Sequence, residues 1–386
     1  MTVLITPGHH EITDTLIMYG LVEALKMRDP FAEVIVVPSG DRYRILTNID
    51  EGEIHYILEE FGKKSYITNL YLYETSQMNI LPPVIRLHML QRGNENRQQE
   101  NIINSFKFLQ ELSGEISKLK KNNLIKKLIY IDENHKFLES RKELETLCGK
   151  RKKSGKFPSV VANLPIAPFG GTLQGVGSYY LCKLCVALAW IGLYYYSSRI
   201  VLSSKDSQQT FVHIFKPESE SKGETILMLK NISQINLLRQ SIFKNSNLNL
   251  HTSAVPLLLL CFGETSAAIS TVNLKSIVYT FTNEKKGPTW RTAIRNIATY
   301  QVNSLIKFVE YSKIYSDKLL RLIDVLLRDR DSDGMLALST LSQAIIYQDK
   351  DQLYSAFREI RRVLSKNKRE NLLDQGIIKA AFESIA

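Results

Sequence analysis

Cysteine is scarce in this sequence, with four residues among 386. So few thiols cannot form a disulfide framework in a chain of this length, and such frameworks belong to oxidising compartments. The first residues also lack the basic, apolar and small-residue pattern of a secretory signal peptide. Both absences favour a reducing environment, so we expect a cytoplasmic protein.

Patterns that bind metal or carry catalysis are lacking as well. His9 and His10 are adjacent, so their side chains point in different directions, and no spaced partner of the His-x-x-x-His kind accompanies them. Cys182 and Cys185 form a Cys-x-x-Cys pair, but the other two cysteines supply no second pair for zinc. We therefore predict no metal, no cofactor and no catalytic residue.

One apolar run, from Tyr179 to Tyr196, approaches membrane-spanning length. Lys183 interrupts it, and no basic flank or second span accompanies it, so we expect no membrane segment. A helix that is apolar on every side must be surrounded by protein. We interpret this run as the buried central helix of the main domain.

The loop before this run is rich in glycine, with Gly170, Gly171, Gly175 and Gly177. It lacks the Gly-Lys-Ser/Thr ending of a phosphate-binding P-loop and the Gly-x-Gly-x-x-Gly of a dinucleotide site. Its backbone can approach a nucleic-acid groove closely, with the Gln174 amide as donor and acceptor. The alternative is an enzyme that binds a phosphorylated small molecule here, with His9 or His10 as base. That alternative ranks lower, because no pair of convergent titratable groups is identifiable around the loop.

Acidic residues are too few to balance the basic ones. Lys and Arg number 50 against 39 Asp and Glu, which gives a formal charge of +11 and a pI near 9.3. This balance favours a polyanionic partner, most often nucleic acid. One cluster marks an exposed linker or loop and contains Lys150, Arg151, Lys152, Lys153 and Lys156.

A second polar and basic group surrounds a turn, with Asn283, Lys285, Lys286, Arg291 and Arg295. The two arginines are four residues apart, which predicts one face of a helix close to its start. Helix starts favour anions, so we expect a contact with phosphate groups. A solvated helix start is an equally good interpretation of the same residues.

Hydrophobic periodicity predicts a mixed α/β part followed by helices. Strands are expected at residues 3–6, 34–37, 43–47, 66–73, 200–202, 210–215, 224–230 and 273–281, and helices at residues 12–25, 54–61 and 232–243. From Thr289 onward the periodicity is helical, with a break at residues 331–334. The predicted fold class is α+β: a mixed α/β domain over residues 1–286, with a helical, basic insertion at about 84–156, and an all-α bundle over 287–386.

Four parts of the sequence carry a family resemblance. They are TPGHHEITDTLIMYGLVEAL, NLPIAPFGGTLQGVGSYYLCKLCVALAWIGLYYYS, FTNEKKGPTWR and the helical ending. In this order they resemble the large subunit of the archaeal subtype I-A CRISPR Cascade. The resemblance covers most of the chain as an order of segments, and the family has no invariant catalytic signature.

The resemblance implies a non-enzymatic subunit of a crRNA-guided interference complex. Such subunits recognise the protospacer-adjacent motif in duplex DNA, start strand separation and support recruitment of the helicase–nuclease. Sequence along the target is read by guide pairing. The implied partners are target double-stranded DNA, the crRNA-bearing backbone and handle-capping subunits, the small subunit and the helicase–nuclease. A ribonucleoprotein subunit that binds RNA alone remains an alternative.

The resemblance also implies roles for the residues named above. In related large subunits a glycine loop enters the minor groove, and a nearby polar side chain reads or wedges it. Gly170, Gly171 and Gln174 match that description by residue type. The basic residues at 150–156 and 285–295 would then hold the phosphates of the duplex.

Overall fold

The computed structural model describes residues 1–40, 42–50, 53–54, 159–161, 180–203, 207–238, 250–263, 269, 271–286, 289–329 and 331–386. These residues form two compact units, each with its own core. The first comprises Met1–Tyr196 and Glu220–Ile226, and the second Ser197–Ser219 and Leu227–Ala386. The expected helical insertion at 84–156, the strand at 66–73 and the glycine loop lie outside the described residues.

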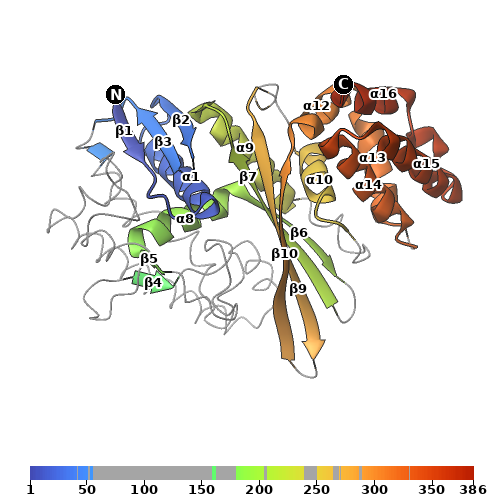
Figure 1. Cartoon of the computed structure of the whole chain (residues 1–386), viewed down its shortest axis with the longest axis horizontal. Coiled ribbons are helices and arrows are strands. Elements are labelled where there is room, and N and C mark those ends of the chain that lie inside the picture. Colours follow the sequence, from blue (N-terminus) through green and yellow to red (C-terminus); the bar gives the residue numbers. More distant parts are fainter. Residues whose placement is uncertain are drawn as a thin grey trace. The chain divides into compact units, whose positions relative to one another are not determined.

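The first unit contains a four-stranded antiparallel sheet in the order β1-β3-β2-β8, of which Figure 1 labels β1, β2 and β3. Its strands are β1 (Thr2–Ile5), β2 (Val34–Ser39), β3 (Arg42–Thr47) and β8 (Ser221–Lys222). Alternate residues of β2 and β3 are buried, so one face of the sheet forms core. Gly40, with φ +62°, provides the left-handed conformation at the β2–β3 turn. The strands expected at 34–37 and 43–47 are confirmed and form a hairpin.

Two helices complete the core of the first unit, α1 (Glu11–Arg28) and α8 (Lys183–Tyr196). Helix α1 packs against both β3 and α8. The rings of Tyr19 and Tyr196 stack in parallel with centroids 4.2 Å apart. The Tyr196 hydroxyl also donates a hydrogen bond to the buried Glu23 carboxylate, at 3.1 Å. The stacked tyrosine rings and the hydrogen bond from Tyr196 to Glu23 therefore join the two helices.

The central helix is shorter than the sequence suggested. Residues Tyr180–Cys182 form strand β5, which pairs with β4 (Ser159–Val161), and the helix begins only at Lys183. The prediction of a helix from Tyr179 was wrong at this end, because pairing with a distant segment satisfies the backbone of these three residues. The burial of the helix itself is confirmed at its described side chains, among them Cys185, Leu188 and Leu193.

The second unit contains another four-stranded antiparallel sheet, in the order β10-β9-β7-β6. Its strands are β6 (Ser197–Ser203), β7 (Ser207–Pro217), β9 (Leu274–Lys286) and β10 (Thr289–Gln301). The expected strands at 200–202, 210–215 and 273–281 are confirmed and run longer than predicted. The strand expected at 224–230 is wrong, because this segment belongs to α9 (Gly223–Leu238). The spacing of the buried Ile226, Leu229 and Ile232 is helical.

Strand β10 also replaces the helix that was expected to begin at Thr289. Its segment contains β-branched and aromatic residues that favour strands, and its backbone pairs with β9 over the whole length. The predicted domain boundary near Lys286 lies at the turn between these two strands, both of which belong to the second unit. The division into 1–286 and 287–386 stays a prediction.

Helices form the C-terminal part of the second unit (Figure 1). They are α12 (Asn303–Tyr311), α13 (Ser316–Leu327), α14 (Asp333–Tyr347), α15 (Lys350–Lys366) and α16 (Gln375–Ser384). Helix α10 (Ala254–Phe262), which precedes β9 in the chain, packs against α12, α13 and α14. Asp349 and Asp374 cap α15 and α16 through their side chains. The expected break at 331–334 separates α13 from α14. The α+β class with a helical C-terminal part is thus confirmed.

Candidate nucleic-acid interface

The structure describes five of the thirteen residues expected to contact DNA. Eight lie outside the described residues: Lys150, Arg151, Lys152, Lys153, Lys156, Gly170, Gly171 and Gln174. The other five, Asn283, Lys285, Lys286, Arg291 and Arg295, lie on the β9–β10 hairpin, at or near its turn. This hairpin is therefore the part of the expected DNA site whose backbone geometry is known.

The register of the hairpin places its basic residues differently from the prediction. Lys285 lies opposite Trp290, and Arg291 lies opposite Glu284. Arg295 falls at a register irregularity between the pairs Ile294–Phe281 and Asn296–Thr280. The expected helical face shared by Arg291 and Arg295 was wrong. Their four-residue spacing is interrupted by a β-bulge, a feature that bends a strand and increases its twist.

Positions on a strand alternate between the two faces of a sheet. Asn283 and Lys285 therefore occupy positions of one face, and Lys286 and Arg291 positions of the other. A hairpin with basic positions on both faces can meet phosphate groups on two sides, as a β-ribbon does in a groove. Strand β10 is also an edge strand of the described sheet, so the hairpin is bordered by other strands on one side only.

A second candidate lies in the loop between β1 and α1, where His9 and His10 had raised the question of acid–base chemistry. The buried Asp14 carboxylate accepts hydrogen bonds from the Thr6 hydroxyl (2.8 Å), the Gly8 amide (2.6 Å) and the His9 amide (3.0 Å). The His10 ring caps α1 by accepting from the Ile12 amide at 3.4 Å. These polar groups hold the loop against the helix.

Burial raises the pKa of Asp14 to about 7, although the amide and hydroxyl donors act in the opposite direction. Gly8 has φ +79°, and a Cβ there would overlap the guanidinium of Arg42. The loop is thus closely packed around Asp14. Its hydrogen bonds explain the arrangement as structural, and nothing in them calls for a substrate.

The described residues contain no group of three or more His, Cys, Asp or Glu side chains able to hold a metal ion. Cys185 is buried in α8, and burial raises the pKa of the Cys261 thiol above its usual range. A thiol of raised pKa is a poor nucleophile at neutral pH. No helix within the described part of the chain is long and apolar enough to cross a membrane.

One face of the second sheet carries buried polar side chains. The register aligns Ser198 with His213, Phe211 with Thr280, and Phe215 with Ser276. The His213 ring nitrogens and the Ser198, Ser276 and Thr280 hydroxyls accept or donate no hydrogen bond in the described structure. Burial lowers the pKa of His213 to about 3, so its ring is neutral at physiological pH.

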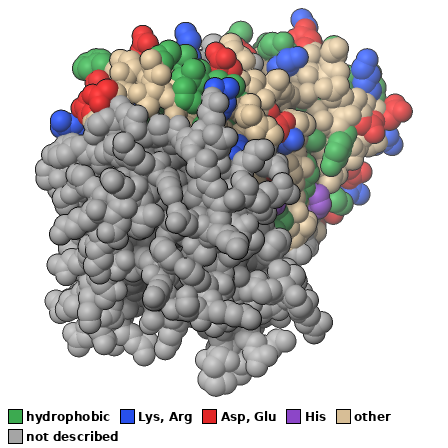
Figure 2. Space-filling view, turned by 60° about the vertical axis from the view of Figure 1, so that its left-hand side comes forward, with side chains coloured by type: hydrophobic (Ala, Val, Ile, Leu, Met, Phe, Trp, Pro, Cys, Tyr) green, Lys and Arg blue, Asp and Glu red, His purple; other side chains and the backbone are tan. Residues whose placement is uncertain are grey.

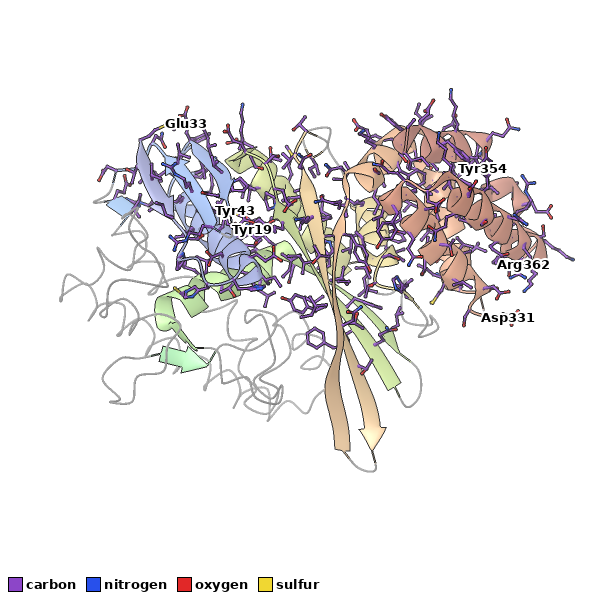
Figure 3. The ribbon with its side chains drawn as sticks, viewed as in Figure 1. Tyr19, Glu33, Tyr43, Asp331, Tyr354 and Arg362 are labelled. Carbon is purple, nitrogen blue, oxygen red and sulfur yellow. The ribbon has the colours of Figure 1, made fainter. Side chains whose placement is uncertain are left out.

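Another group of basic residues lies on and after α15. Arg362 and Lys366 pair with Asp333 at 3.3 and 2.9 Å, whereas the exposed Arg358 and Arg361 form no ion pair with any described residue. Figure 3 shows Arg362 and Asp331 at the outer end of the helices. In the coloured part of Figure 2, Lys and Arg side chains are interspersed with Asp and Glu. This mixture of charges is typical of a solvated surface.

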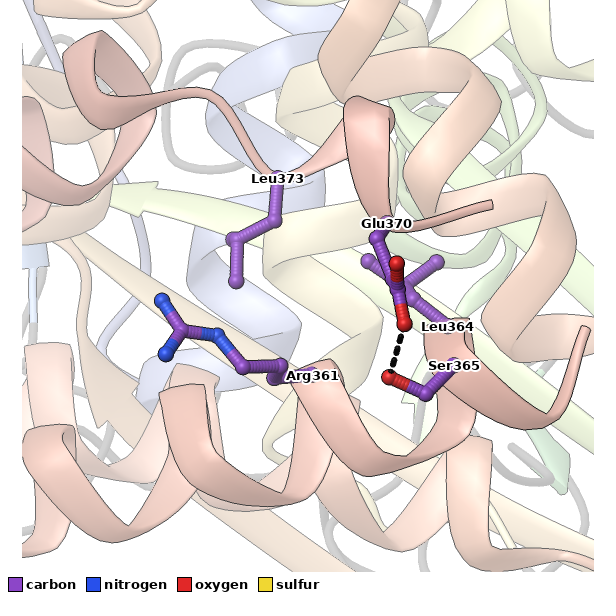
Figure 4. Close-up of a pocket in the computed structure, with 5 residues that line it drawn as sticks. All are labelled: Arg361, Leu364, Ser365, Glu370 and Leu373. Carbon is purple, nitrogen blue, oxygen red and sulfur yellow. Dashed lines mark hydrogen bonds between the residues drawn. The ribbon is translucent and has the colours of Figure 1, made fainter. Parts of the chain in front are cut away.

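A pocket of about 290 Å³ adjoins this group (Figure 4). It is lined by Arg361, Leu364, Ser365, Glu370 and Leu373. Sequence reasoning missed Ser365 and Glu370. The local signal was weak, because Glu370 joins the pocket only through the fold of the turn after α15.

Comparison with known proteins agrees with the resemblance of the sequence segments. Residues 2–379 match a family model described as CRISPR-associated protein (Cas_Csa4). A relative from Methanocaldococcus jannaschii, CRISPR-associated protein Cas8a2/Csa4, is 27% identical over 379 residues, which cover 93% of this chain and 88% of the relative. The match spans nearly the whole chain and defines the class, large subunits of the CRISPR Cascade. Within this class, the chain belongs to the Csa4 (Cas8a) family.

Proposed function

We propose that the protein is the subunit of a type I-A interference complex that recognises the protospacer-adjacent motif in duplex DNA and initiates strand separation. The observation that carries this proposal is the family match over residues 2–379. The formal charge of +11 supports a DNA partner, since phosphate contacts dominate the affinity of such proteins. The complex acts in the cytoplasm, where it recruits the helicase–nuclease after the strands have separated.

In this proposal the glycine loop and the cations have separate tasks. Gly170 and Gly171 let the main chain enter the minor groove, and Gln174 reads or wedges the base pairs there. The cations at 150–156 and those of the β9–β10 hairpin hold phosphates, which positions the duplex without reading its sequence. The crRNA-bearing backbone, the handle-capping subunit and the small subunit are the proposed protein partners.

The test is a mobility-shift assay with the reconstituted complex on duplexes that carry either the motif or a scrambled one. Replacing Gly170 and Gly171 by leucine should reduce the ratio of the two affinities, because bulky side chains keep the loop out of the groove. Gly40→Asn serves as the control, because a Cβ at Gly40 meets nothing within 4 Å and Asn tolerates its φ of +62°. Unchanged motif preference in the leucine variant would remove the loop from the site.

A further inference from the structure

The pocket after α15 is built from a rigid helix ending. Lys368 adopts a left-handed conformation, with φ +53°, and its amide donates to the Ser365 carbonyl at 3.1 Å. The next amide, that of Arg369, donates to the Leu364 carbonyl at 2.9 Å. These bonds satisfy the last carbonyls of the helix and direct the chain sharply back toward it. Glu370 is thereby brought beside Ser365 and across from Arg361.

Two opposite charges line this pocket without pairing. The Ser365 hydroxyl donates to one oxygen of Glu370 at 2.6 Å, which orients the carboxylate and leaves the other oxygen available. Arg361 lies on the other side of the pocket, toward Leu373 (Figure 4), and no ion pair joins it to Glu370 in the described structure. A ligand between the two must donate hydrogen bonds to a carboxylate and accept them from a guanidinium.

Guanine has this combination of groups on adjacent edges. Its N1–H and N2–H₂ donors match a carboxylate, and its O6 and N7 acceptors match a guanidinium, which is the commonest specific contact to this base. Adenine places a donor beside N7, and thymine offers a single N–H. Neither base can therefore donate fully to the Glu370 carboxylate and also accept from the Arg361 guanidinium. Leu364 and Leu373 supply apolar surface for the face of a flat base. The volume of about 290 Å³ is at the lower end of small-ligand sites.

We propose that this pocket binds one unpaired guanine of a single-stranded nucleic acid. A strand is the occupant favoured over a protein segment, because further exposed cations neighbour the pocket residues in the sequence. Arg358, Lys368 and Arg369 are exposed and form no ion pair with any described residue. Arg358 precedes Arg361 by one helical turn, and Lys368 and Arg369 directly precede Glu370, so these cations add affinity for any strand. Glu370 and Arg361 supply the preference for guanine.

The test uses the full chain and fluorescence anisotropy with ten-nucleotide oligothymidine strands, with or without one central guanine. The guanine strand should bind about tenfold more tightly. Inosine, which lacks the 2-amino group, and 7-deazaguanine, which lacks the N7 acceptor, should each lose part of that preference. Glu370→Gln should reduce the preference to within about twofold, and it should raise the affinity for oligothymidine, because it removes a negative charge beside the strand. Arg361→Gln should reduce both the preference and the affinity for every strand.

Matched controls are Glu310→Gln and Arg321→Gln, which change exposed or half-exposed residues of α12 and α13 outside the pocket. Both should retain the preference for guanine. Equal binding of all strands by the wild-type protein would overturn the proposal, as would a preference for guanine that survives in Glu370→Gln.

A thermal-shift comparison measures the protein with guanosine monophosphate and with N-acetylglutamine amide. Stabilisation by the amide alone would also overturn the proposal and assign the pocket to a carboxamide side chain of a protein partner.

This site goes beyond the proposed reading of the protospacer-adjacent motif, and the two can fail separately. Motif recognition is measured on duplexes with the assembled complex and variants of the glycine loop. The guanine preference is measured on single strands with the protein alone and variants of Glu370.

Discussion

Gly20 of α1 lies directly against the backbone carbonyl of Leu188 in α8, and a Cβ at this glycine would overlap the carbonyl oxygen. The relationship is reciprocal, because a Cβ at Gly192 of α8 would overlap the carbonyl of Leu16 in α1. Two helices can approach this closely only where both lack side chains at the crossing. The close approach lets Tyr19 and Tyr196 stack beside it.

We therefore expect Gly20→Ala and Gly192→Ala each to lower the free energy of unfolding by about 1–3 kcal/mol, because an added methyl group forces the helices apart. Chemical denaturation followed by circular dichroism measures the change. Gly40→Asn should leave stability nearly unchanged, because the space around this turn is open. Alanine variants as stable as the wild type would show that the crossing relaxes without cost.

Asp14 predicts a pH dependence of stability. Burial raises its pKa from 3.8 to about 7 in the folded protein, so between these values the folded state holds a proton that the unfolded state releases. The stabilisation from this group is complete below pH 3.8 and is lost as the pH rises through 7. In urea denaturation, the stability of the wild type relative to Asp14→Asn should fall between about pH 4 and 7 and then level off.

Asp317→Asn is the control for this measurement, because Asp317 is exposed on α13. Its stability relative to the wild type should stay constant over the same pH range. A parallel pH profile for wild type and Asp14→Asn would contradict a raised pKa at Asp14.

The buried hydroxyl of Thr280 makes no hydrogen bond in the described structure, whereas that of the equally buried Thr252 bonds to the Tyr300 hydroxyl. Thr252→Val should cost about 1 kcal/mol, because it leaves Tyr300 without this partner. Thr280→Val should be neutral or stabilising, since it replaces an unsatisfied polar group by a methyl group of the same shape. Equal losses in thermal denaturation would show that Thr280 has a partner in solution.

Phosphate contacts predict a change in the salt dependence of duplex binding. Replacing Lys152 and Lys153 by alanine, or Lys285 and Lys286, should weaken binding to all duplexes alike. The slope of log affinity against log salt should become shallower by about one unit per lost contact. Lys307→Ala and Lys313→Ala, on or just after α12, give a matched change in charge. A pair whose replacement leaves the slope unchanged makes no phosphate contact.

Much of the fold was predictable from local pattern. The β2–β3 hairpin followed from two apolar runs around Gly40, and α1 from apolar residues at helical spacing behind His10. The later helices followed from the same periodicity, broken at Asp331–Gly334. Their signals lie within one element and do not depend on what that element contacts.

Two of the errors share one cause, since each concerned a segment that pairs with another strand. Tyr180–Cys182 is a strand because β4 pairs with it, and Thr289–Gln301 is a strand because β9 does. The four-residue spacing of Arg291 and Arg295 suggested a helical face, but both residues lie in β10, which pairs with β9. Within the described residues, pairing between strands outweighed local preference in these places.

The sequence by itself determined the α+β class, the position of most elements, the basic character and the family, because composition, periodicity and segment order are local or additive properties. Only the tertiary structure decided that Gly20 meets Leu188, that the hairpin cations occupy two faces, and that Glu370 lies across a pocket from Arg361. These relationships depend on how the backbone is paired and packed in three dimensions, which neither composition nor periodicity specifies.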